Sequence, residues 1–362
     1  MTAEQPDHPA IPSLAAGSAR PPRTEHDVAL LDLDGVVYVG AEAVPGAPAA
    51  LDAARTAGMR LGFVTNNASR TPAEVADHLT DLGVPAGPDD VITSSQAAAT
   101  VTAQQFGAGA AVLPVGGPGV AVALTEAGLR VVGSAAGRPV AVVQGYGTDV
   151  GWTQLAEAVV AVRGGARHVA TNTDATIPSP RGLLPGNGAL VGVVSAVTGQ
   201  EPLVTGKPDP AMHAECVRRT GARTPLVVGD RLDTDVEGAS RAGARSLLVL
   251  SGVTTPAVLL AAAPGQRPDL LAPDVDGLNR THPRVDADGD SWRCGAWTAT
   301  SSGAGLRLTR NGVAGPDDGC DGLRALCVAH WAAHPDAGAA VRVSGEGTEV
   351  QEALARWDLA GG

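Results

Sequence analysis

The sequence predicts an α/β protein built around a Rossmann-like, doubly wound parallel sheet. Three observations support this fold class. From residue 27 onward, short apolar segments of strand length alternate with longer segments of helical pattern. Acidic residues directly follow two of the apolar segments, at Asp32 and Asp230. The alternation restarts near residue 109 before the first sheet is complete, which indicates a second α/β unit inserted into the first.

The first part of the central sheet is expected in residues 25–108. Thr71-Pro72-Ala73-Glu74 is typical of a helix N-cap followed by proline at the first helical position. Short apolar runs are typical of buried parallel strands. On this basis strands are expected at 27–33, 59–65 and 91–92, and helices at 48–57, from 71 to about 82, and up to 105.

The inserted α/β unit is expected to span residues 109–203, after which the central sheet resumes over 204–264. The insertion contains three further strands and three helices, with a loop rich in glycine and proline between its third strand and its third helix. Its strands are expected at 111–115, 139–143 and 167–171, and its helices at 120–127, 152–162 and 189–198. The resumed sheet contributes strands at 226–228 and 246–250.

Composition changes after residue 264. Pro and Asp gather through residues 264–290, which predicts a linker over 265–284. Residues 285–362 hold most of the tryptophans and cysteines and predict a small α+β module. Its elements are expected to be a hairpin at 292–300 and 305–309, a helix at 322–333, a strand at 339–343 and a final helix. At the other end, residues 1–24 lack an apolar run and are expected to form a loose, solvated tail.

Charge and cysteine usage exclude several classes of function. A net charge of −12 and a pI near 5.0 argue against binding to nucleic acid or to an anionic membrane. No window of about 18 apolar residues predicts a membrane span. Because the four cysteines form no CxxC pair, neither a thiolate metal site nor a disulfide framework is expected, and a cytoplasmic location fits best.

The chain contains 26 lysines and arginines together, and Lys207 is the single lysine among them. A lysine kept where arginine is used everywhere else suits a task that a planar guanidinium cannot perform, such as placing a compact charge on a crowded phosphate. The alternative is chance, since one lysine has to fall somewhere. Pro208 follows Lys207, so the segment is not a Walker A loop, which requires Ser or Thr there.

Asp32-Leu33-Asp34-Gly35 lies at the carboxyl end of the first strand, the edge where open α/β sheets bind ligands. Residues i and i+2 share one side of an extended chain, so both carboxylates can face one reacting group. One could attack phosphorus while the other acts as a general acid and base. A solvated acidic loop at the end of a strand is the alternative.

A second acidic group, Asp230, Asp233 and Asp235, follows the strand at 226–228. Carboxylates this close repel one another unless a cation lies among them, and Mg²⁺ prefers oxygen ligands. Asp230 is the expected ligand; the alternative is a helix N-terminus carrying stabilising acids. Thr65 ends another strand at the same edge, where its hydroxyl and the following N–H could bind phosphate oxygens.

Taken in order, Asp32 with Asp34, Thr65, Lys207 and Asp230 resemble the four motifs of the haloacid dehalogenase superfamily. The longer strings Asp-Leu-Asp-Gly-Val-Val-Tyr, Val-Thr-Asn-Asn-Ala-Ser, Gly-Lys-Pro and Val-Gly-Asp-Arg-Leu-Asp-Thr-Asp resemble its type IIA phosphatases. The resemblance covers residues 25–255. The insertion lies between the second and third motifs, where that subfamily carries a C2-type cap.

The resemblance implies a role for each matching residue. Asp32 would be the nucleophile and Asp34 the general acid and base. Asp32, the main-chain carbonyl of Asp34 and Asp230 would hold Mg²⁺. The remaining motif residues would bind phosphate or support those that do: Thr65, Asn66 and Lys207 in the first role, and Asp235 and Asn67 in the second.

The cap loop is expected to cover the leaving group, with Asn172, Asp174, Thr176 and Arg181 as specificity residues. Each could equally be an ordinary member of a turn-rich surface loop. More narrowly, the whole chain is similar to the actinobacterial glycerol 3-phosphate phosphatases, in which a type IIA body is joined to an acetyltransferase-like C-terminal region. The extension here lacks an Arg-x-x-Gly-x-Gly loop for coenzyme A, so a stabilising or oligomer-forming role is an equal expectation.

The resemblance implies a small phosphorylated metabolite as substrate, with no nucleic-acid or membrane partner. Glycerol 3-phosphate is expected first; the alternatives are phosphoglycolate, pyridoxal phosphate, nucleotide monophosphates and 4-nitrophenyl phosphate. Two rival classes remain open. One is a phospho-accepting signalling domain, which would lack both a cap and Asp34, and the other is an acyltransferase with a phosphatase-like scaffold. Assembly into a homo-oligomer through the cap or the C-terminal module is also left open.

Overall fold

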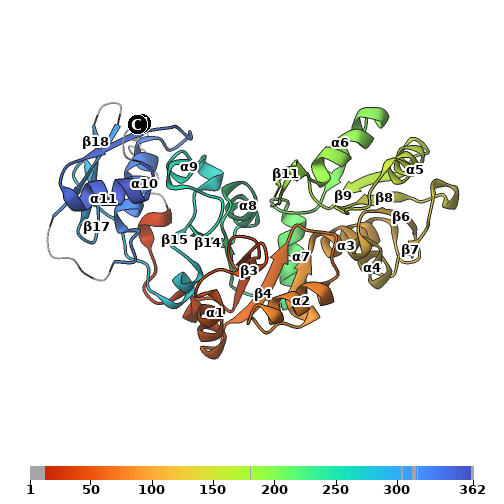
Figure 1. Cartoon of the computed structure of the whole chain (residues 1–362), viewed down its shortest axis with the longest axis horizontal. Helices are drawn as coiled ribbons and strands as arrows, with labels where there is room; N and C mark the ends of the chain where they lie inside the picture. The colour runs from red at the N-terminus through yellow and green to blue at the C-terminus, as the bar shows by residue number, and fades with distance from the viewer. Residues whose placement is uncertain (1–12, 180, 303–304, 312–314, 316, 360–362) are drawn as a thin grey trace, which may run out of the picture.

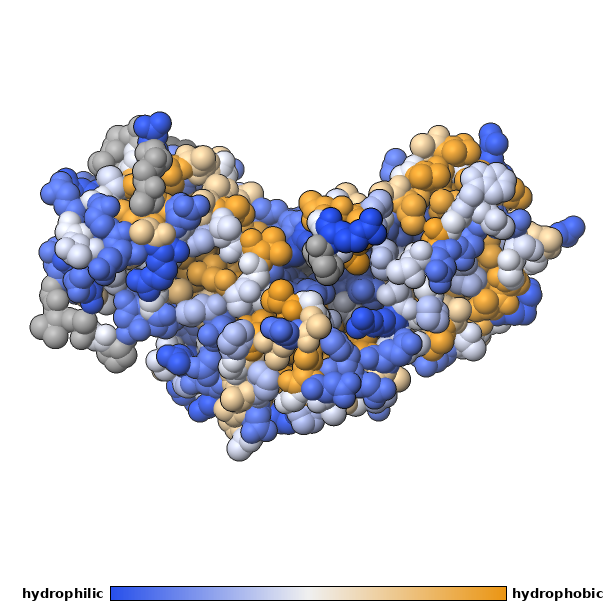
Figure 2. All heavy atoms as spheres, in the orientation of Figure 1, coloured by the Kyte–Doolittle hydropathy of each residue, from blue (hydrophilic) through white to orange (hydrophobic). Residues whose placement is uncertain are grey.

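The computed structural model describes residues 13–179, 181–302, 305–311, 315 and 317–359. The central domain lies between two arms, the inserted cap on one side and the C-terminal module on the other (Figure 1). A hollow opens between the arms on the face shown in Figure 2. Among the described residues, no helix is long and apolar enough to cross a bilayer.

The central domain is a six-stranded sheet in the order β15-β14-β13-β1-β4-β5, with every neighbouring pair parallel. The strands are β1 (Val28–Asp32), β4 (Arg60–Thr65), β5 (Val91–Thr93), β13 (Pro225–Gly229), β14 (Arg245–Val249) and β15 (Leu270–Ala272). A two-stranded flap, β2 (Tyr38–Val39) and β3 (Glu42–Ala43), follows β1. The doubly wound parallel sheet predicted from the alternation of apolar segments is therefore confirmed.

Helices cover both faces of this sheet, and each face has its own apolar core. Residues of α1 and α2 pack in the core of one face, and residues of α3 and α7 pack in that of the other. The helices are α1 (Ala47–Thr56), α2 (Pro72–Asp81), α3 (Ser94–Phe106), α7 (Pro210–Thr220), α8 (Glu237–Ala242) and α9 (Pro256–Leu260). The predicted cap at Thr71 is present: its hydroxyl accepts from Glu74 N, and the Glu74 carboxylate accepts from Thr71 N.

The cap is a second parallel sheet of five strands in the order β12-β9-β8-β6-β7. Its strands are β6 (Ala111–Val115), β7 (Arg130–Val131), β8 (Ala141–Gln144), β9 (Arg167–Ala170) and β12 (Leu203–Val204). Helices α4 (Pro118–Glu126), α5 (Trp152–Arg163) and α6 (Asn187–Thr198) flank it. Between β9 and α6 an antiparallel hairpin, β10 (Thr176–Ser179) and β11 (Gly182–Pro185), projects beside the central domain (Figure 1).

The C-terminal module has five strands in sequence order, antiparallel except for the parallel pair β19 and β20. They are β16 (Asp286–Asp288), β17 (Ser291–Cys294), β18 (Trp297–Ser302), β19 (Gly305–Arg310) and β20 (Arg342–Gly345), with helices α10 (Asp321–Ala333) and α11 (Thr348–Arg356). The segment expected as one strand at 292–300 is two, because Gly295 makes a turn at φ +57. The last strand begins later than expected, since the carbonyl of Ala339 accepts a hydrogen bond from His330 instead.

The expected linker over 265–284 is wrong. This segment contains β15, which completes the edge of the central sheet beside β14. The 3₁₀ turn Val275–Asn279 follows, with Val275 and Leu278 buried in the central core. The prolines and acids that suggested a linker flank an apolar triplet too short to stand out in the sequence.

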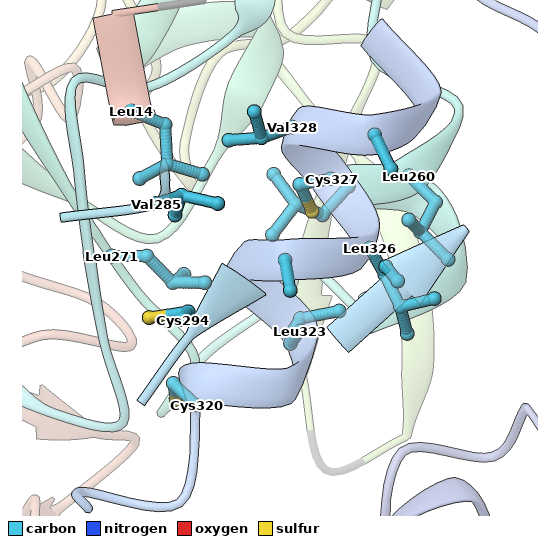
Figure 3. Close-up of a cluster of buried hydrophobic side chains, with 14 of the residues drawn as sticks. Leu14, Leu260, Leu271, Val285, Cys294, Cys320, Leu323, Leu326, Cys327 and Val328 are labelled. Atoms are coloured by element: carbon cyan, nitrogen blue, oxygen red, sulfur yellow. The ribbon is translucent and has the colours of Figure 1, made fainter. Parts of the chain in front are cut away.

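The expected tail also differs over its described part, residues 13–24; residues 1–12 lie outside the described ones. Leu14 and Ala15 are buried in an apolar cluster shared by the central domain and the C-terminal module. Figure 3 shows Leu14 and Val285 beside α10, with Leu260 and Leu271 of the central domain in the same cluster. The C-terminal module is thus packed on the central domain through a common core.

Candidate active site

Three adjacent strands of the central sheet carry the predicted motif residues at one edge. Asp32 ends β1, Thr65 ends β4, and Asp230 follows β13, and these strands are neighbours in the order β13-β1-β4. In a parallel sheet, neighbouring carboxyl ends open on the same side, where ligands bind. Lys207 reaches this edge from the segment by which the chain returns from the cap.

A cluster of three carboxylates occupies this edge. Oxygens of Asp32, Asp230 and Asp235 all lie within 4.8 Å of one another. Asp230 and Asp235 are almost fully buried. Burial, followed by the charge of Asp32, raises the pKa of Asp230 to about 6. Three carboxylates this close together and shielded from water repel one another, so a cation is needed to stabilise their ionised forms.

The orientation of Asp230 suits a metal ligand. Its Oδ2 accepts a hydrogen bond from Val253 N at 2.6 Å, whereas its buried Oδ1 has no hydrogen-bond partner among the described residues. Gly35, at φ +81, leaves room for this carboxylate, since a Cβ there would lie 2.5 Å from Oδ2. Gly252 is also too close to Oδ2 to carry a side chain. An orphaned carboxylate oxygen among acids fits a hard divalent cation such as Mg²⁺.

Lys207 supplies a fixed positive charge beside the carboxylates. Its Nζ donates to Oδ1 of Asp32 and to Oδ1 of Asp235, each at 2.7 Å. Burial alone would lower the pKa of the lysine, but the charges of Asp235 and Asp32 outweigh this and raise its pKa. Lys207 is therefore protonated throughout the physiological range, as a phosphate ligand must be.

Asp34 lies two residues beyond β1 at the exposed mouth of the site. Although its side chain reaches solvent, the surrounding protein, and then the charges of Asp32 and Asp230, raise its pKa to about 6. A carboxyl group with a pKa near the working pH can both give and accept a proton. This is the property required of a general acid and base.

The loop after β4 is ordered by its own side chains. The Thr65 hydroxyl oxygen accepts from Asn67 N at 3.0 Å, and Asn67 Oδ1 accepts from Ser69 N at 2.9 Å and from Ser69 Oγ at 2.7 Å. Asn67 therefore shapes the loop. Because the Thr65 hydroxyl acts only as an acceptor in this loop, its hydrogen is available to donate to a phosphate oxygen.

The cap loop meets this motif at Asn66. Asn172 Nδ2 donates to the Asn66 carbonyl at 2.7 Å, and Asn66 Nδ2 donates to Asp174 Oδ2 at 3.3 Å. The structure thus brings Asn172 and Asp174 to the site. It does not do so for the other two expected cap residues: Thr176 lies exposed in β10, Arg181 lies at the exposed turn, and among the described residues neither forms a hydrogen bond or ion pair with the carboxylate cluster.

Two features of the site were not predicted. The Ser251-Gly252-Val253 segment after β14 anchors the site: Val253 N holds Asp230, and Ser251 Oγ donates to the Gly35 carbonyl at 2.6 Å. Because this segment follows an apolar strand at the same edge of the sheet, its sequence position could have predicted that it lies at the site. Arg231 forms a bidentate pair with Asp233 (3.0 and 2.8 Å), so Asp233 is engaged there.

The comparisons with known proteins agree with this geometry. Residues 29–130 match a haloacid dehalogenase-like hydrolase family, and residues 204–278 match a HAD-hydrolase-like family. Residues 294–359 match a GCN5-related N-acetyltransferase like domain.

The chain is 41% identical over 345 residues to a D-glycerol 3-phosphate phosphatase of Mycobacterium tuberculosis, covering 92% of this chain and 95% of the relative. A crystal structure of the glycerol phosphate phosphatase from that organism in complex with magnesium superposes with a TM-score of 0.84 at 41% identity, covering 94% of this chain and 99% of that one.

Two further relatives match a smaller share of this chain. An acid sugar phosphatase of Staphylococcus aureus is 39% identical over 228 residues, which cover 62% of this chain and 87% of the relative. A p-nitrophenyl phosphatase from Archaeoglobus fulgidus gives a TM-score of 0.65 at 28% identity over 70% of this chain and 98% of that one. From its motifs, its sheet edge and these relatives, the chain belongs to the haloacid dehalogenase-like hydrolases.

Proposed function

We propose that this protein is a Mg²⁺-dependent phosphatase of small phosphomonoesters, with glycerol 3-phosphate as its preferred substrate. The observation that carries the proposal is the ion triad in which Lys207 Nζ lies between Asp32 and Asp235, beside Asp230 Oδ1, which has no hydrogen-bond partner in the described part of the chain. The relatives named for glycerol 3-phosphate and glycerol phosphate support the choice of substrate.

Asp32, Asp230 and the main-chain carbonyl of Asp34 would hold Mg²⁺. When bound, the ion neutralises the carboxylate cluster and the incoming phosphate and stabilises charge that develops in the transition state. The residues fit this role because Val253 N orients Asp230, and its buried Oδ1 is not hydrogen-bonded to any residue that the structure describes.

The remaining groups orient the phosphoryl group and attack it. Asp32 attacks phosphorus in line with the departing oxygen and becomes an aspartyl phosphate. Lys207 and the Thr65 hydroxyl donate hydrogen bonds to the phosphoryl oxygens. Lys207 also holds the attacking carboxylate in place, since its Nζ donates to Asp32 Oδ1 at 2.7 Å.

Asp34 moves the protons. In its acid form it protonates the departing alkoxide, and as the resulting carboxylate it removes a proton from the water that hydrolyses the aspartyl phosphate. Its raised pKa of about 6 supports both steps at neutral pH. General acid–base catalysis of this kind contributes about 10²–10⁴-fold.

The test is turnover of a panel containing glycerol 3-phosphate, phosphoglycolate, pyridoxal phosphate, nucleotide monophosphates and 4-nitrophenyl phosphate, with Mg²⁺ and with EDTA. We expect Mg²⁺-dependent release of phosphate, the highest kcat/KM for glycerol 3-phosphate, and none in a folded Asp32→Asn variant. A folded Asp32→Asn protein that retains turnover would rule out the nucleophile. A stable phosphoprotein formed from a small phosphodonor without turnover would favour a signalling domain instead.

A further inference from the structure

The side-chain amide of Asn66 forms hydrogen bonds to both backbone polar groups of Lys207. Its Oδ1 accepts from Lys207 N at 2.8 Å, and its Nδ2 donates to the Lys207 carbonyl at 3.1 Å. Two bonds between one amide and one residue fix both the position and the rotation of that segment. The lysine whose charge faces Asp32 is thus held at its backbone by a residue 141 positions earlier in the chain.

The same amide reaches the cap loop. Its second hydrogen is directed to Asp174 Oδ2 at 3.3 Å, and the Asn66 carbonyl accepts from Asn172 Nδ2 at 2.7 Å. A side-chain amide has two hydrogens to donate. Both are used here, one on Lys207 and one on Asp174, so the side chain has no hydrogen left for a phosphate.

Lys207 is also close to the cap along the chain. Thr205 is still bonded to the cap sheet, because its N and Oγ1 donate to the Ala170 carbonyl at 3.1 and 3.3 Å. Gly206 packs against the Thr171 carbonyl and Asn66 Oδ1 too closely to accept a Cβ. Lys207 therefore enters the site two residues after the last bond to the cap sheet, so a displacement of the cap would be passed to its backbone.

From this convergence we infer that Asn66 is a positioning residue that makes the alignment of Lys207 on the reacting phosphate depend on the seating of the cap loop. When Asp174 is in place, it holds the amide in the orientation that bonds to Lys207. When the loop lifts, Asn66 loses the amide bond to Asp174 and the main-chain bond from Asn172, and the lysine is free to shift from Asp32. The inference assigns Asn66 a coupling role in place of the direct phosphate binding expected from the resemblance, and it rests on the proposed phosphatase function.

The test is a double-mutant cycle of Asn66→Ala and Asp174→Ala, with kcat and KM measured on glycerol 3-phosphate and on 4-nitrophenyl phosphate. Misplacing a catalytic group by about 1 Å costs roughly 10²-fold, so we expect kcat of Asn66→Ala to fall about 10- to 100-fold on both substrates. Because the coupling passes through Asn66, Asp174→Ala should lower kcat in the wild-type background and have little further effect in Asn66→Ala.

Ser94→Ala is the matched control. Ser94 Oγ donates to the Asn66 carbonyl at 2.7 Å but does not contact the amide, so its removal should leave kcat near the wild-type value. A merely structural role of Asn66 would lower thermal stability and give multiplicative effects with Asp174→Ala.

Two results would overturn the inference: wild-type kcat in Asn66→Ala, or independent effects of the two substitutions. If Asn66→Ala fails to fold, the kinetics of Asp174→Ala alone test the inference. An effect of Asp174→Ala on KM without an effect on kcat would contradict coupling to Lys207. Inactivity of the wild-type protein on every phosphomonoester would instead refute the proposed function.

Discussion

Nζ of Lys207 lies 2.7 Å from Oδ1 of Asp32, although the two residues are 175 positions apart in the chain. The side chain of Lys207 is 11% exposed and that of Asp32 is 13% exposed, so the pair is largely shielded from solvent. Asp235, 1% exposed, takes the second bond of the same ammonium. The site therefore has room for one compact cation between two carboxylates. Substitutions of these residues should change turnover and metal binding in measurable ways.

Replacing Lys207 by arginine should fail to preserve activity even though the charge is kept. A planar guanidinium cannot make the same two 2.7 Å contacts from one nitrogen in this space. We expect kcat to fall about 10²–10³-fold, as when one preorganised donor to the transition state is lost. Steady-state kinetics of Lys207→Arg and Lys207→Ala would show this. Arg284→Lys, in an exposed ion pair with Asp286, is the matched exchange and should be neutral; near-normal turnover by Lys207→Arg would contradict the argument.

Replacing Asp230 by asparagine should weaken Mg²⁺ binding more than it disturbs the fold. The amide oxygen can still accept from Val253 N, but the buried negative charge that attracts the ion is gone. We expect thermal stability of the wild-type protein to rise with added Mg²⁺, because a ligand that binds only the native state stabilises it. The Asp230→Asn protein should show little of this rise and should require far more Mg²⁺ for turnover.

Asp89→Asn, in an exposed 3₁₀ turn, controls for the loss of one negative charge. Equal Mg²⁺ responses of wild-type protein and Asp230→Asn would exclude Asp230 as a ligand.

The cap should lose stability in mild acid because of His168. This side chain is fully buried, with Nε2 3.0 Å from Oε1 of Gln144, and burial lowers its pKa from 6.5 to about 4. Between these values the unfolded chain binds a proton that the folded chain does not, so stability is full above pH 6.5 and is lost as pH falls toward 4. From pH 7 to pH 5 the loss from this group is about 2 kcal/mol.

Urea unfolding at the two pH values would measure this loss, with His168→Gln as the test variant. That variant cannot titrate in this range, so the difference in unfolding free energy between pH 7 and pH 5 should shrink by about the same 2 kcal/mol. An unchanged difference would mean that His168 is not the responsible group.

Arg324 of the C-terminal module should contribute strongly to the free energy of unfolding of the protein. Its guanidinium, 1% exposed, pairs with Asp318 at 2.6 Å and Asp321 at 2.7 Å and also donates to the Leu271 carbonyl of β15. Removing one partner of a buried ion pair leaves uncompensated charge and costs about 3–5 kcal/mol. We expect Arg324→Ala to lose that much in denaturant unfolding.

Arg307→Ala supplies the comparison, since the Arg307–Glu346 pair lies exposed at the surface and should contribute less than about 1 kcal/mol. A small loss in Arg324→Ala would show that the module is joined to the central domain mainly by the apolar cluster around Leu271 and Cys327.

Much of the catalytic edge was determined by the local sequence. Apolar runs ending in Asp32, Thr65 and Asp230 predict buried parallel strands, and parallel strands must open their carboxyl ends on one side. The spacing between motifs likewise indicated where the cap is inserted. These inferences hold because strand burial and helix capping depend on residues a few positions apart.

The tertiary structure alone decided which side chains share their hydrogen bonds. Nothing local in the sequence indicates that the amide of Asn66 is occupied by Lys207 and Asp174, or that Leu270–Ala272 joins the central sheet rather than a linker. Such contacts join positions far apart in the chain, and their energies depend on packing and burial that exist only once the domains are assembled. Local patterns therefore determined the chemistry available to this protein, and the assembled fold determined which of those groups act together.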